Sequence, residues 1–79
     1  MEINKLIDSR VKEHSQVMDA IMVDIEELRK VVSKLKQENN VQEMALQAQK
    51  LLALKDRMMF HKAAVLVLND LKEDLNGRK

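Results

Sequence analysis

Residues 36–43 read KQENNVQE, and this stretch decides the fold because the hydrophobic repeat before it does not continue beyond it. From Ile7 to Leu35, apolar residues recur at two positions of a seven-residue repeat, which is the pattern of an amphipathic helix with one buried seam. A second repeat, in a new register, runs from Met44 to Leu75. We therefore predict one helix at about 3–37, a turn at 38–40 and a second helix at about 41–75. One uninterrupted helix with a shifted register is the alternative.

Each predicted seam is apolar apart from a single histidine. The first helix carries Ile7, Val11, His14, Met18, Ile21, Ile25, Leu28, Val32 and Leu35. The second carries Met44, Leu51, Leu54, Met58, His61, Val65, Leu68 and Leu75. An antiparallel hairpin packs these seams together, and it places His14 and His61 near the same level.

The ends of the predicted helices carry recognisable capping residues. Asn40 followed by Glu43 resembles a capping box, in which the Asn oxygen accepts from an early backbone N–H and the Glu side chain reaches back. Lys34 and Lys36 place positive charge at the last turn of the first helix, where it favours the helix dipole. We expect Gly77 to stop the second helix.

The composition predicts an all-α chain of one domain, residues 1–79. Pro is absent, Gly occurs once, and Leu, Met, Ala, Glu, Lys and Gln favour helices. A monomer of this size buries only about 60% of its unfolded surface, and without Cys it has no disulfide to stabilise it. Self-association is therefore the expected source of stability. The charged start MEINKLIDSR lacks the apolar run of a signal peptide, and the apolar clusters are too short to span a membrane, so we expect a cytoplasmic protein.

Charges on the two predicted helices are complementary in an antiparallel hairpin. An acidic block in the first helix falls opposite basic residues of the second: Asp19, Asp24, Glu26 and Glu27 opposite Lys50, Lys55 and Arg57. The start of the first helix is basic and the end of the second is acidic: Lys5, Arg10 and Lys12 opposite Asp70, Glu73 and Asp74. We expect these blocks to favour one register over others.

Residues 58–68, MMFHKAAVLVL, are apolar on every side of a helix. A helix of this kind is buried by more than one neighbour, and the first helix covers only one side. We therefore expect two hairpins to dock as a homodimeric four-helix bundle, with a higher oligomer or a hetero-complex as alternatives. The predicted oligomer or partner interface is Leu52, Met59, Phe60, Ala63, Leu66 and Val67.

Other candidate sites involve the histidines, the acidic block and the basic residues near the turn. With only two histidines and no Cys, we predict no metal site or other cofactor. The acidic block lacks a nucleophile or a glycine loop beside it, so we predict that the protein is not an enzyme. Basic residues near the turn are candidate phosphate contacts: Arg29, Lys30, Lys34, Lys36 and Lys50.

The function expected from these features is that of a small protein-binding regulator or adaptor, similar in action to a chaperone or an inhibitor. Methionines in or near the seams, such as Met18, Met22, Met44, Met58 and Met59, suit an adaptable surface that binds another protein, although they also suit plain core filling. The alternative is a helical oligomer that binds nucleic acid or a nucleotide through the basic residues near the turn.

Overall fold

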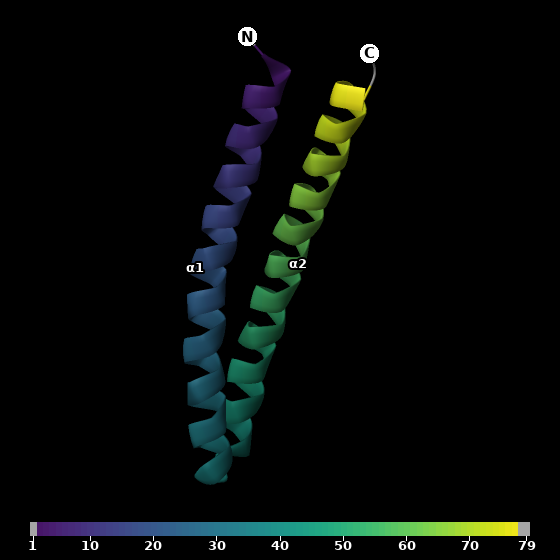
Figure 1. Ribbon diagram of the computed structural model, residues 1–79. Coiled ribbons are helices and arrows are strands. Elements are labelled where there is room, and N and C mark those ends of the chain that lie inside the picture. The colour runs from purple at the N-terminus through teal and green to yellow at the C-terminus, as the bar shows by residue number, and fades with distance from the viewer. Residues whose placement is uncertain (1, 78–79) are drawn as a thin grey trace.

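The chain folds as a helical hairpin. The structure is a computed structural model, and it describes residues 2–77. Helix α1 (Ile3–Gln37) and helix α2 (Val41–Gly77) lie side by side, and the start of α1 and the end of α2 are at the end opposite the turn (Figure 1). The hairpin measures 61 × 15 × 13 Å. Helix α1 has the expected bounds, and α2 runs two residues beyond its expected end at residue 75.

The turn confirms that the chain is a hairpin, so the alternative of one uninterrupted helix is wrong. Asn39 adopts the left-handed conformation with φ 57°. The backbone N–H of Asn40 donates to the Leu35 carbonyl at 3.0 Å, and the N–H of Asn39 donates to the Lys36 carbonyl at 3.2 Å. These two bonds form a Schellman motif, which satisfies carbonyl groups at the end of α1 and reverses the chain. Lys34 and Lys36 lie in the last turn of α1, as expected.

The start of α2 has half of the expected capping box. The Asn40 Oδ1 atom accepts from the Glu43 backbone N–H at 3.4 Å, and the Asn40 carbonyl accepts from the Met44 N–H at 3.0 Å. The reciprocal bond is not made, because the Asn40 N–H is used by the Leu35 carbonyl and the Glu43 Oε1 atom accepts from Gln47 Nε2 at 2.8 Å. Asn40 therefore caps α2 while its backbone still belongs to the end of α1.

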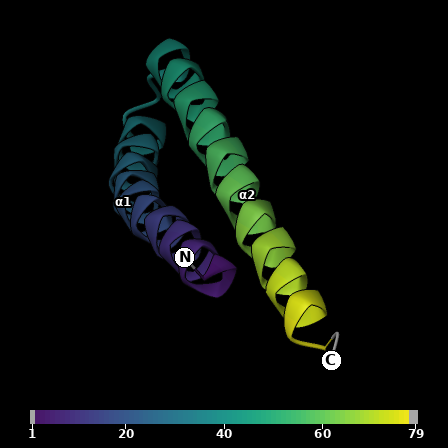
Figure 2. The same ribbon diagram turned by 90° about the horizontal axis from the view of Figure 1, so that it is seen from above.

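The seam between the helices follows the heptad prediction. In α1, Ile7, Ile21 and Ile25 are only 3–4% exposed, and the other predicted seam residues are half-buried. All predicted seam residues of α2 are half-buried, but α2 contains no fully buried residue. Figure 2 shows why: within residues 2–77, no third element covers the other sides of the helices. The core is therefore a single seam. Three of its residues on α1 are buried, whereas its residues on α2 are half-buried.

Two expectations about the ends of the hairpin are corrected. Gly77 is the last residue of α2 and does not adopt a positive φ, so it does not stop the helix in the way expected. In this part of the hairpin, Lys72 of α2 pairs with Asp8 of α1 at 2.6 Å, the opposite polarity to the expected contact. Arg10 instead pairs within its own helix, with Glu13 at 3.2 Å. A neighbouring residue one turn away holds a long side chain at less entropic cost than a partner on the other helix.

Candidate interaction surface

The six predicted interface residues all lie at the surface of α2, on two different faces. Phe60, Ala63 and Val67 line a groove between the helices, whereas Leu52, Met59 and Leu66 line neither groove described below. The five large side chains are 61–67% exposed. Their role in an interface stays a prediction, but their placement shows that α2 presents two apolar surfaces instead of one.

The first groove, here named the middle groove, is an apolar depression of about 390 Å³. It is lined by His14 of α1 and by Phe60, Ala63, Ala64, Val67 and Leu68 of α2. The two alanines leave space beside the large side chains, and Phe60 stands edge-on to the His61 ring with centroids 5.3 Å apart. An apolar side chain from another helix fits such a depression better than a charged one.

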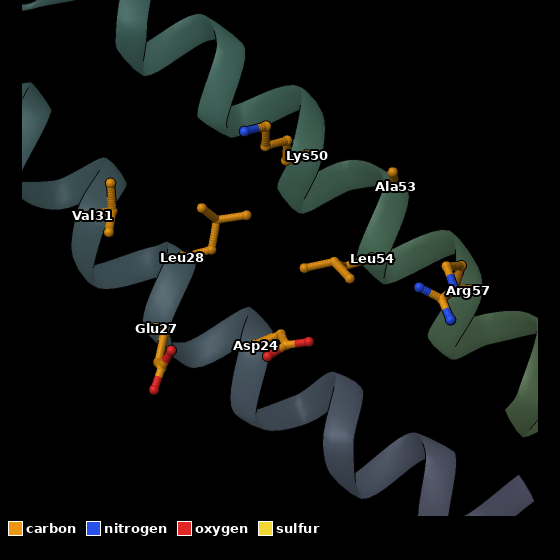
Figure 3. Close-up of a pocket in the computed structure, with 8 residues that line it drawn as sticks. All are labelled: Asp24, Glu27, Leu28, Val31, Lys50, Ala53, Leu54 and Arg57. Carbon is orange, nitrogen blue, oxygen red and sulfur yellow. The ribbon is translucent and has the colours of Figure 1, made fainter.

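The second groove, here named the turn-side groove, has a volume of about 510 Å³ and lies between the middle groove and the turn. Leu28 and Leu54 point towards each other and form its floor (Figure 3). Asp24, Glu27 and Val31 line it on α1, and Lys50, Ala53 and Arg57 line it on α2. The groove therefore has one acidic wall and one basic wall above an apolar floor.

Charged residues of the expected blocks do meet at the turn-side groove, but not as ion pairs. Asp24 and Arg57 reach towards the opposite helix, whereas Glu27 points away from α2 (Figure 3). In the part of the chain that the structure describes, the ion pairs within 4.0 Å are Arg10–Glu13 and Lys72–Asp8. The acidic and basic walls consequently remain available to charges outside the hairpin.

Both grooves open on the same face of the hairpin. Ala53 of the turn-side groove and Phe60 and Val67 of the middle groove are spaced by seven residues. Arg57 and Ala64 have the same spacing, and residues seven apart lie on the same side of a helix. We name this side the groove face. The opposite flank carries the Asp8–Lys72 ion pair and is mainly polar, with Ser15, Arg29, Lys55, Lys62 and Asn69 beside the exposed Met22.

Leu52, Met59 and Leu66 form a separate surface, here named the outer stripe. They are also spaced by seven residues, and each directly follows a seam residue, so they are turned by about 100° from the seam. Their exposure of 61–64% agrees with a position that α1 does not cover. Two copies that dock through their groove faces would leave the outer stripe in solvent.

The two histidines meet at the seam, as the heptads predict. Their Nδ1 atoms lie 2.8 Å apart, and the tilted rings have centroids 5.0 Å apart. Both side chains are half-buried, and His14 borders the middle groove. Among residues 2–77, no group of three or more His, Cys, Asp or Glu side chains is placed to hold a metal ion.

The candidate phosphate contacts do not gather into one patch. Arg29 and Lys36 are seven residues apart and share the polar flank, whereas Lys50 lines the turn-side groove opposite acidic residues. Lys30 and Lys34 lie on further sides of α1, at about 100° and 140° from Arg29. The basic charge is therefore spread around the turn end of the hairpin.

The grooves were not foreseen from the sequence. Their signal is present in two heptad columns of the second helix, one running through Ala53, Phe60 and Val67 and the other through Arg57 and Ala64. The second column begins with the charged residues Lys50 and Arg57 and becomes apolar only from Ala64 onwards. A hydrophobic pattern taken over the whole helix therefore does not reveal its apolar half.

Within residues 2–77, neither helix is long and apolar enough to cross a membrane. Comparisons with protein-family models, with curated proteins and with solved structures found no match.

Proposed function

We propose that this chain is a non-enzymatic, protein-binding regulator or adaptor of the cytoplasm that acts as a homodimeric four-helix bundle. The observation that supports this most is that α2 is apolar on two exposed faces and contains no fully buried residue. Helix α1 covers only the seam, so two further neighbours are needed to cover the groove face and the outer stripe.

The small core of the hairpin supports self-association. Only Ile7, Ile21 and Ile25 are buried in the described part of the chain, while Phe60 and Val67 are 67% and 65% exposed. Burying one large apolar side chain contributes about 1.5–3 kcal/mol. Docking of two groove faces buries several such side chains twice, because a twofold interface repeats each contact.

The outer stripe supports a role in binding another protein. Leu52, Met59 and Leu66 form an exposed row on one helix, and contiguous apolar surface of this kind marks interaction sites on soluble proteins. A row with helical spacing pairs well with the apolar side of an amphipathic helix. Met59, at its centre, adapts its shape to different partners.

Neighbouring residues on the two faces give a matched test. Leu66 belongs to the outer stripe and Val67 to the groove face, and their exposures are similar, at 61% and 65%. By light scattering at micromolar concentration, the wild type should have twice the chain mass of 9.2 kDa. Val67→Glu should shift it to the monomer, because an unpaired charge in an apolar interface is strongly disfavoured. Leu66→Glu should remain a dimer.

Partner binding is tested with the same variants. Cross-linking in a lysate of the source cells should join the wild type to a second protein, and Leu66→Glu should lose this product. Ser33→Glu, an exposed substitution on α1, is the control and should retain it. A cooperatively folded helical monomer, or equal capture by wild type and Leu66→Glu, contradicts the proposal.

A further inference from the structure

We infer that the second copy docks turn beside turn, so that α2 of the partner lies over α1 along the whole groove face. This inference rests on the proposed homodimer and adds the direction in which the two hairpins run. The observation that supports it is that the groove face has charged walls at the turn-side groove and is apolar at the middle groove.

Two twofold arrangements bring groove face onto groove face. An axis along the hairpin places the two turns together and lays each α1 over the partner's α2. An axis across the hairpin places the turns at opposite ends and lays α1 over α1 and α2 over α2. In both cases neighbouring helices are antiparallel, so helix direction alone does not choose between them.

The turn-side groove favours the first arrangement. Asp24 and Glu27 line its α1 wall, and Lys50 and Arg57 line its α2 wall at the same level. With the turns together, the acidic wall of each copy faces the basic wall of the other, and this contact occurs twice. Opposite charges across an interface select one register and orientation over others.

The middle groove disfavours the second arrangement. Helix α2 runs from Val41 to Gly77, so turning it about its own centre places the turn-side groove over the level of the middle groove. Lys50 and Arg57 of one copy would then face Phe60, Val67 and Leu68 of the other. Desolvating a charge against apolar side chains without a partner is unfavourable. With the turns together, apolar surface instead meets apolar surface.

The distance between the two turns tests the inference directly. The chain has no Cys, so Glu38→Cys introduces one attachment site for a spin label at the exposed end of α1. With the turns together, the two labels should lie roughly 20 Å apart, which is about two helix spacings. With the turns at opposite ends, their separation should approach the 61 Å length of the hairpin.

A label near the middle of α2 is the control for this measurement. Asp56→Cys is exposed and lies close to the centre of the helix, so it should give a short distance in either arrangement. A dimer with a short distance at Asp56 and a long one at Glu38 overturns the inference and leaves the homodimer standing. A monomer with no measurable distance at either site overturns both.

Charge reversal provides a second test that separates contacts between copies from contacts within one copy. Asp24→Lys/Glu27→Lys makes both walls basic, and Lys50→Glu/Arg57→Glu makes both walls acidic. Each variant alone should dimerise at least about tenfold more weakly, because like walls then face each other twice. An equimolar mixture should regain the wild-type affinity as a heterodimer. A mixture that remains as weak as the separate variants overturns the inference, because mixing leaves the contacts within each hairpin unchanged.

Discussion

The Nδ1 atoms of His14 and His61 lie 2.8 Å apart, so two imidazoles from different helices meet directly at the seam. A contact of this length needs one N–H donor and one nitrogen lone pair, and either ring can be the donor. Removal of either ring therefore removes the contact.

Loss of either imidazole should therefore destabilise the fold. In urea denaturation, His14→Ala and His61→Ala should each lower the free energy of unfolding by at least about 1 kcal/mol, the contribution of one hydrogen bond.

The double variant His14→Ala/His61→Ala is the control for this contact. It removes both partners at once, so the contact between them is lost only once. The loss in its free energy of unfolding should therefore be smaller than the sum of the two single losses. Additive losses would mean that the two imidazoles do not interact.

The turn should be sensitive to the residue at position 39. Asn39 has φ 57°, a conformation that Gly adopts without cost and that other L-residues adopt with strain. Asn39→Ala should lower the free energy of unfolding by about 1 kcal/mol, whereas Asn39→Gly should leave it unchanged or raise it. Thermal and urea denaturation at one protein concentration measure both. Equal stability of the Ala and Gly variants would contradict a role for the left-handed turn.

The heptad pattern was sufficient to predict the hairpin and its seam. Ile21, Ile25 and His61 lie where the repeat places them, because burial of an apolar stripe is a property of the whole helix and does not depend on a single contact. The change of register before Met44 also predicted the position of the turn, because each repeat is the buried stripe of one helix.

Individual polar contacts and the grooves were not predictable in this way. Arg10 was expected opposite acidic residues of the second helix but pairs with Glu13, since a long side chain has several partners of similar energy and the pattern does not rank them. The middle groove depends on the small size of Ala63 and Ala64 beside Phe60. The shape of that surface follows from packing in three dimensions, which a list of apolar positions does not contain.

The three buried isoleucines should carry a large share of the stability. Ile21 is 3% exposed, and replacement of a buried Ile by Ala costs about 2–5 kcal/mol through lost burial and the cavity left behind. Val23 is 56% exposed on the same helix, so Val23→Ala is a matched control that should change stability by no more than about 0.5 kcal/mol. Comparable losses for Ile21→Ala and Val23→Ala would show that the seam is not the core.

Salt should separate the proposed protein partner from a phosphate-containing ligand. Binding through the outer stripe is apolar, so its affinity should change little between about 50 and 200 mM salt. Binding to nucleic acid through the basic residues near the turn should weaken steeply over the same range, because each neutralised phosphate releases a counterion. Lys34→Gln/Lys36→Gln removes two charges from the last turn of α1 and should leave capture of the protein partner unchanged. If these substitutions abolish binding and the wild-type complex dissociates at the higher salt, the nucleic-acid or nucleotide alternative replaces the adaptor function.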